Sequence, residues 1–167
     1  MHSSVSIWIA APPDRVFPLV AALDRWPMLL PHYRYVRVTG RSGSVVRARM
    51  SARRGPIPVF WEAEQTPDAA SRTIRFRHVG GVTRGMDVLW TFQPERDGAR
   101  EGTRATITHD LEFRFGPRPM GRFLAERVLA PQFIEPIAGA TLRRFKSLAE
   151  APETGRGALP ADAQAPA

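Results

Sequence analysis

The chain has 167 residues, of which 43% are hydrophobic and 24% charged, so it is long enough for one globular domain with a substantial core. It contains no cysteine, which excludes disulfides, thiolate metal ligands and a cysteine nucleophile. The formal net charge is +8, and arginine carries almost all of it because Lys146 is the only lysine. This excess indicates either an arginine-rich codon bias or an acidic partner, such as a carrier protein or an anionic membrane surface.

Three further classes of protein are disfavoured. The arginines alternate along expected strands and form no basic run interleaved with exposed aromatics, which argues against nucleic-acid binding. The apolar runs are much shorter than the ~20 residues of a membrane-spanning helix. The N-terminus lacks a basic segment followed by an apolar one, so we expect no signal peptide and a cytoplasmic location.

The chain opens with a strand and a helix. Residues 5–10 alternate as a strand does, and the segment 12–14 (Pro-Pro-Asp) is typical of a helix start. Residues 26–33 follow, with a Trp before and a His and a Tyr after two prolines that interrupt a regular helix. Such amphipathic side chains on a short, interrupted segment can line a cavity as readily as they fill a core.

The middle of the chain predicts a meander of six strands. Turn residues separate the strands at 55–56, 66–68, 80–81 and 96–98, and such short connections favour antiparallel pairing. The predicted strands are residues 35–39, 45–53, 57–65, 73–78, 86–93 and 103–115.

The hydrophobic period becomes helical after Met120. Pro131 and Pro136 predict a short helix, a kink and then a long C-terminal helix. Residues 151–167 are rich in Ala, Pro and Gly and are expected to be a disordered tail, which leaves a single domain at 1–150. The predicted fold class is α+β, with one curved antiparallel sheet wrapped around a long terminal helix and two short helices after the first strand.

Alternation predicts which side chains face the concave side of this sheet. If Glu62 and Glu64 face solvent, the opposite face of that strand points inward, and the same argument applies to the next three strands. The inward set is Val59, Trp61, Ala63, Gln65, Ile74, Phe76, His78, Met86, Val88, Trp90, Phe92, Ile107, His109, Leu111 and Phe113.

Three members of this mostly apolar set are polar, which is typical of a small-molecule site. His109 lies in mid-strand and is either a structural histidine or a pocket residue. His78 precedes Gly80-Gly81, so we expect it at an exposed rim, and Gln65 precedes a turn that it can stabilise. The tryptophans of this face are either pocket walls or core residues.

The sequence shows no motif for several other kinds of catalytic or binding site. The histidines show no metal-ligand spacing with acids, so no metal is expected, and no serine has a nucleophile-elbow context. A glycine-rich phosphate loop and a pair of inward carboxylates are both missing.

A set of short segments resembles the START-like superfamily of helix-grip proteins and, more narrowly, its polyketide cyclase/aromatase branch. The resemblance covers residues 4–149. It implies the fold more directly than an activity, because the superfamily contains enzymes, lipid carriers and quinone-binding chaperones. The segments are 6–12, Val16-Phe17, Trp26-Pro27, Tyr33, Trp61-Glu62, Pro67-Asp68, 71–75 and 89–92.

This resemblance implies a pocket in which a poly-β-ketone undergoes aldol cyclisation and dehydration. The family's catalytic arginine falls on Gln65, which cannot supply a fixed positive charge to a developing enolate. Either another residue acts, such as His109 as base with Tyr33 as donor, or the cyclase chemistry has been lost. By position, the family's pocket residues match Trp26, Tyr33, Trp61, Trp90, His109 and Thr141.

The first functional hypothesis is therefore an aromatase/cyclase that acts on a polyketide bound to an acidic acyl carrier protein, without a cofactor. His109 would abstract the α-proton, while Tyr33 and Gln65 would bind the carbonyl oxygens. The expected ligand-binding residues are Trp26, Leu30, Trp61, Ala63, Phe76, His78, Trp90, Ile107, Leu111 and Thr141.

The second hypothesis is a non-catalytic binder of a lipid, a quinone or another hydrophobic aromatic molecule, similar to the coenzyme-Q-binding branch. The basic charge would then favour peripheral contact with an anionic membrane. A third hypothesis is a cochaperone or ligand sensor of the same fold, which no residue pattern distinguishes from the others.

Overall fold

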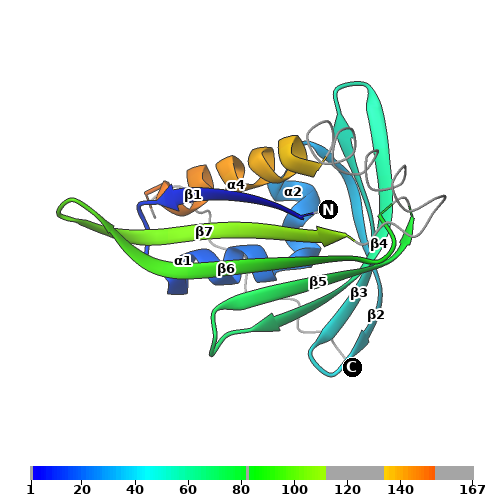
Figure 1. Cartoon of the computed structure of the whole chain (residues 1–167), viewed down its shortest axis with the longest axis horizontal. Helices are drawn as coiled ribbons and strands as arrows, with labels where there is room; N and C mark the ends of the chain where they lie inside the picture. The colour runs from blue at the N-terminus through cyan, green and yellow to red at the C-terminus, as the bar shows by residue number, and fades with distance from the viewer. Residues whose placement is uncertain (1, 82, 112–133, 153–167) are drawn as a thin grey trace, which may run out of the picture.

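A computed structural model of the chain describes residues 2–81, 83–111 and 134–152. Within these ranges seven strands form one antiparallel sheet in the order β1-β7-β6-β5-β4-β3-β2 (Figure 1). Strands β2 to β7 therefore form a meander, and β1 extends the sheet by pairing with β7. The strands are β1 His2–Ile9, β2 Tyr33–Ser42, β3 Val45–Arg54, β4 Ile57–Asp68, β5 Thr73–Gly81, β6 Met86–Asp97 and β7 Arg100–Leu111.

Short helices follow β1, as the sequence predicts. Helix α1 (Pro13–Ala21) begins after Pro12, which is extended, and it carries Asp14 in its first turn. A proline at the first helical position loses no hydrogen bond, and an acid there complements the helix dipole. One turn of 3-10 helix, η1 (Leu23–Arg25), and the four-residue α2 (Trp26–Leu29) lead into β2.

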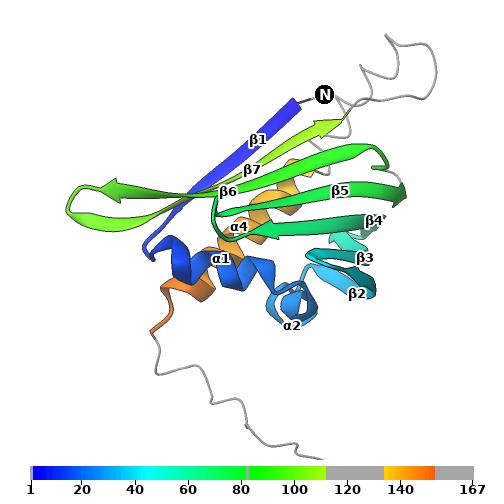
Figure 2. The same ribbon diagram turned by 90° about the horizontal axis from the view of Figure 1, so that it is seen from below.

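Helix α4 (Glu135–Glu150) lies on the concave side of the sheet, as does α1 (Figure 2). Its buried side chains recur every three or four residues, which places them on one face. These residues are Ala138, Thr141, Leu142, Phe145 and Ala149. The predicted α+β architecture, with its curved sheet, terminal helix and two short early helices, is confirmed. None of the helices in the described residues is both long and apolar enough to cross a membrane.

Several strands extend further than predicted, and two of the predicted turns lie inside strands. Residues 66–68 continue β4 instead of forming a turn, because the turn lies at 69–72, where Asp68 Oδ1 accepts hydrogen bonds from the amides of Ala70 and Ser71. Gly80 and Gly81 likewise belong to β5. Residues 112–115 of the last predicted strand, the short helix after Met120 and the tail from 153 lie outside the described residues.

An aromatic cluster forms the middle of the core around Trp26, which is 2% exposed. Its indole Nε1 donates a hydrogen bond to the Val20 carbonyl oxygen at 2.9 Å, so the one polar atom of this side chain is satisfied. The ring centroids of Tyr33, Phe76, Trp90 and Phe145 lie 5.4–6.1 Å from that of Trp26. The cluster joins α2, the sheet and α4.

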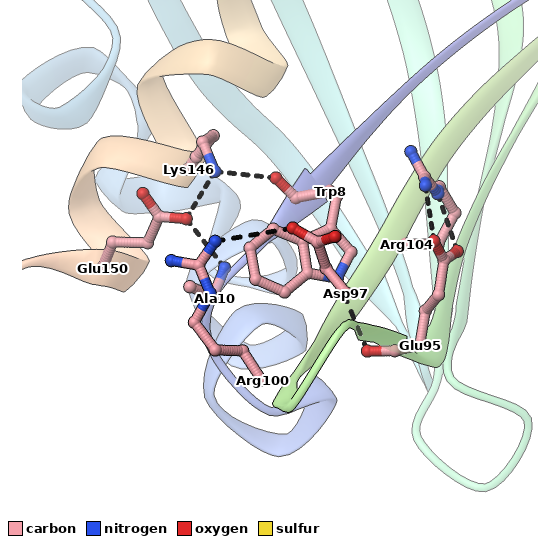
Figure 3. A network of polar contacts seen from close by, with 8 residues as sticks. All are labelled: Trp8, Ala10, Glu95, Asp97, Arg100, Arg104, Lys146 and Glu150. Carbon is pink, nitrogen blue, oxygen red and sulfur yellow. Dashed lines mark hydrogen bonds and ion pairs between the residues drawn. The ribbon is translucent and has the colours of Figure 1, made fainter.

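A polar network around Trp8 connects β1, the β6–β7 hairpin and the last turns of α4 (Figure 3). Lys146 Nζ donates to the Trp8 carbonyl oxygen at 2.8 Å and forms an ion pair with Glu150. The Arg100 guanidinium and the Lys146 ammonium each lie 5.3 Å from the Trp8 ring centre, within the range of cation–π attraction. This network holds the C-terminal end of α4 on the edge of the sheet.

Candidate functional site

A cavity lies between the concave face of the sheet, α2 and the N-terminal half of α4. The space open to the centres of water-sized molecules is about 80 Å³. Five of the lining side chains carry a polar group and the rest are apolar or indole rings, a composition typical of sites for hydrophobic small molecules. The lining consists of Trp26, Tyr33, Met50, Val59, Trp61, Phe76, His78, Thr83, Met86, Val88, Trp90, Ile107, His109, Ile134, Ile137, Ala138 and Thr141.

Aromatic rings form much of the cavity wall. Tyr33, the first residue of β2, packs edge-on against Trp26 at 5.4 Å and against Trp61 of β4 at 5.9 Å. Trp61 in turn is parallel to the imidazole of His78, with 5.9 Å between ring centroids and 5° between planes. These contacts hold flat side chains in fixed orientations, so a flat ligand would meet preformed surfaces.

His78 and Thr83 form a polar pair at the end of β5. The two residues are 7% and 4% exposed, and 2.6 Å separates His78 Nδ1 from Thr83 Oγ1. Burial lowers the pKa of His78 to about 3, and the neighbouring His109 adds to this shift. His78 is therefore an uncharged hydrogen-bonding group at neutral pH.

His109 lies on β7 and is 5% exposed. Its Nδ1 is 3.5 Å from Ser3 Oγ, a long contact that leaves Nε2 as the ring nitrogen available to a ligand. Burial lowers the pKa of His109 to about 4, while Asp110 opposes this shift and His2 adds to it. A neutral imidazole is the form that accepts a proton, so His109 is in the basic form at neutral pH.

Tyr33 and Thr141 place two hydroxyl groups on another part of the wall. Burial raises the pKa of the Tyr33 hydroxyl far above its usual range, and the nearby Thr141 hydroxyl opposes the shift. Tyr33 thus stays protonated at any physiological pH. Thr141 donates its own proton to the Ile137 carbonyl oxygen at 2.8 Å and contacts His32 Nε2 at 2.8 Å.

Most of the residues predicted from the sequence do line this cavity. His78, which we expected at an exposed rim, is buried because β5 continues to Gly81 and the following turn folds over it. The predicted residues in the lining are Trp26, Tyr33, Trp61, Phe76, His78, Trp90, Ile107, His109 and Thr141.

Four predicted residues do not contribute to the lining: Leu30, Ala63, Gln65 and Leu111. Gln65 does point to the concave side and is 1% exposed. Its Nε2 donates to the Ala21 carbonyl oxygen at 3.3 Å, so its amide stabilises the end of α1 instead of reaching the cavity. Alternation identified the face of the strand correctly, but α1 covers this part of it.

Sequence reasoning missed Thr83, because a threonine in a turn carries no signal of burial. It also gave no role to Met50 of β3 or to the first residues of α4. Within the ranges that the structure describes, no group of three or more acidic or histidine side chains could hold a metal ion.

A curved antiparallel sheet wrapped around a C-terminal helix, with a cavity between them, is the helix-grip fold of START-like proteins. The chain belongs to the family described as polyketide cyclase / dehydrase and lipid transport, whose model matches residues 9–135. The family resemblance that the sequence indicates is therefore confirmed.

Individual relatives agree with this assignment. The granaticin polyketide synthase bifunctional cyclase/dehydratase of Streptomyces violaceoruber is 30% identical over 102 residues, which are 60% of this chain and 32% of that longer protein. The chain thus spans about one third of this relative.

Two solved structures share the fold. The Zhui aromatase/cyclase of Streptomyces sp. R1128 superposes with a TM-score of 0.71 at 20% identity, over 90% of this chain and 93% of that one. A START superfamily protein of Mycobacterium smegmatis gives 0.62 at 18% identity, over 88% and 98% of the two chains. At these identities the likeness establishes the fold alone.

Proposed function

We propose that the protein is a polyketide cyclase that binds a hydrophobic, polyketide-type ligand in this cavity and promotes aldol cyclisation and dehydration. One observation carries the proposal: a neutral imidazole, that of His109, and a protonated phenol, that of Tyr33, line the same aromatic cavity. A base and a hydrogen-bond donor are the two groups that enolate formation requires. Membership of the cyclase/dehydrase family supports the proposed cyclase function.

The chemistry would proceed in two proton-transfer stages. His109 Nε2 accepts a proton from a methylene group between two carbonyls, and the resulting enolate oxygen receives a hydrogen bond from the Tyr33 hydroxyl. The enolate carbon then attacks a distant carbonyl carbon, a C–C bond forms, and the new alkoxide takes the proton back from the His109 imidazolium. Loss of a second α-proton and of the hydroxyl group as water then forms a C=C double bond in the new ring. The aromatic walls hold the chain folded during these steps.

The charge distribution supports an acidic carrier protein as the partner. Most carboxylates of the described residues pair with a cation, for example Glu62 with Arg49. Arg34, Arg84 and Arg143 form no ion pair among the described residues, and each lies within two residues of a cavity-lining side chain. These arginines carry positive charge without an ion-pair partner on the elements that line the cavity, and such charge would attract an acidic carrier protein.

The decisive experiment is a reconstituted polyketide synthase supplied with wild-type protein, His109→Asn or Tyr33→Phe. We expect His109→Asn to lower the yield of cyclised product about 100-fold or more and Tyr33→Phe to lower it by a smaller factor. Tyr35→Phe is the matched control, because Tyr35 is the second of the two tyrosines and lies outside the lining. An unchanged product distribution with both cavity variants would rule out the mechanism.

A non-catalytic lipid or quinone carrier is the second candidate. Two observations favour it. Gln65 stands where the resemblance to aromatase/cyclases places a catalytic arginine, and its side chain faces α1. His109 is a weak base with a pKa of about 4. Native mass spectrometry with organic extraction of freshly purified protein separates the two candidates. A copurifying isoprenoid, quinone or acyl chain without turnover of polyketides would support the carrier.

A further inference from the structure

The imidazole of His78 is held in one orientation by contacts that converge on the end of β5. Thr83 Oγ1 lies 2.6 Å from its Nδ1, and the Trp61 indole stacks on its face. The backbone of the same turn is tied down as well, since the Gly85 amide donates to the His78 carbonyl oxygen at 2.9 Å. Because Thr83 engages Nδ1, Nε2 is the ring nitrogen of His78 that remains for a ligand in the cavity that this residue lines.

The donors and acceptors available to His78 and Thr83 favour one tautomer of the imidazole. Apart from His78 Nδ1, the Thr83 hydroxyl has no hydrogen-bond partner in the described part of the chain. If Thr83 donates, its proton and the Nδ1 lone pair are both used, and only Nε2–H remains to be satisfied. If Nδ1–H donated instead, both the Thr83 proton and the Nε2 lone pair would lack a protein partner. The first arrangement leaves fewer buried polar groups unpaired and is therefore favoured.

We propose that Thr83 is a positioning residue that holds His78 as its Nε2–H tautomer, so that His78 donates a hydrogen bond to a carbonyl or enolate oxygen of the ligand. The inference rests on the proposed function, because it takes the same cavity as the ligand site. It adds a second hydrogen-bond donor, a neutral group on β5, to the Tyr33 hydroxyl, whereas the amide of Gln65 is engaged by the Ala21 carbonyl oxygen. The ligand class that this donor selects is a flat, apolar molecule with at least one carbonyl oxygen.

The tautomer is tested directly by NMR of protein labelled with ¹⁵N-histidine, with the His78 signals assigned from their loss in His78→Gln. We expect protonated Nε2 and unprotonated Nδ1 in the wild type and in Thr83→Ser, and a mixture of tautomers in Thr83→Val. The His109 signals serve as the internal reference for correct folding. A wild-type protein with the proton on Nδ1 would overturn the proposal, even if Thr83→Val failed to fold.

The consequence for ligand binding is tested with two probes of nearly the same shape, 2-acetylnaphthalene and 2-isopropenylnaphthalene, of which only the first has a carbonyl oxygen. We expect Thr83→Val to weaken binding of the ketone roughly five- to tenfold, to leave the hydrocarbon unchanged, and to be rescued by Thr83→Ser. Equal effects on both probes would overturn the donor role. Binding of neither probe would count against the proposed function of the cavity, while the NMR result still decides the role of Thr83.

Discussion

His32 Nε2 lies 2.8 Å from the hydroxyl oxygen of Thr141, and this hydrogen bond joins the segment after α2 to the buried face of α4. The direction of this bond follows from the neighbouring contact. When the single hydroxyl proton of Thr141 points to the Ile137 carbonyl oxygen, the His32 imidazole is the donor, from its Nε2–H.

Removal of this hydroxyl should loosen the contact between α4 and the α2–β2 segment. We expect Thr141→Val to lower the free energy of unfolding by about 1–2 kcal/mol, because the half-buried His32 loses its hydrogen-bond partner at the buried Thr141 position. Thr141→Ser keeps the oxygen and should recover most of the loss. Urea denaturation at neutral pH measures both variants, and a valine variant as stable as the wild type would contradict the assignment.

The two cavity histidines should make stability depend on pH. In the unfolded chain both take up protons below about pH 6.5, whereas in the folded protein their pKa values are about 3 for His78 and about 4 for His109. Between these limits the unfolded state binds more protons. The contribution of the two histidines to the free energy of unfolding is therefore fully present above about pH 6.5 and decreases as the pH is lowered. We expect a loss of about 2 kcal/mol per histidine between pH 7 and pH 5.

Urea denaturation at several pH values checks this dependence. His78→Gln and His109→Gln should each remove about half of the contribution of these two residues, and the double variant should keep only the dependence from His32, whose pKa burial also lowers. A wild-type protein whose stability does not change between pH 7 and pH 5 would show that the imidazoles are solvated in the native state.

The same burial of His109 predicts the pH profile of catalysis under the proposed mechanism. As the pH falls through about 4, the imidazole gains a proton and can no longer act as a base. We therefore expect kcat/KM to stay constant from neutral pH downward and its acid limb to lie near pH 4, not near 6.5. Circular dichroism of the same samples separates this titration from unfolding, and an acid limb near 6.5 would assign the base to another group.

Gly102 is required by the packing of Trp8 on the β6–β7 hairpin. A Cβ at this position would lie 2.7 Å from Trp8 Cζ2 and would overlap the Ile9 carbonyl oxygen. We expect Gly102→Ala to lower the free energy of unfolding by about 2 kcal/mol or more, since neither the indole nor the β1 backbone can move freely. Gly40→Ala is the control, because no atom lies within 4 Å of its Cβ position, and thermal unfolding of both variants makes the comparison.

The part of the site that could be predicted is the part that depends on strand alternation. His109 and Trp61 were placed on the concave face because side chains two residues apart share a face, and both line the cavity. Alternation does not reveal what lies opposite each residue. Gln65 and Trp61 therefore share the predicted face, although α1 covers Gln65 and the cavity adjoins Trp61.

The sequence by itself determined the order of the elements, the helix-grip architecture and the aromatic character of the concave face, because periodicity and turn residues act over a few neighbouring positions. Only the tertiary structure decided which polar groups meet. Thr83 reaches His78 through a turn whose course depends on the whole β5–β6 hairpin, and Thr141 reaches His32 across 109 positions of sequence. Burial of these groups then sets the protonation of the histidines, and burial is a property of the folded chain.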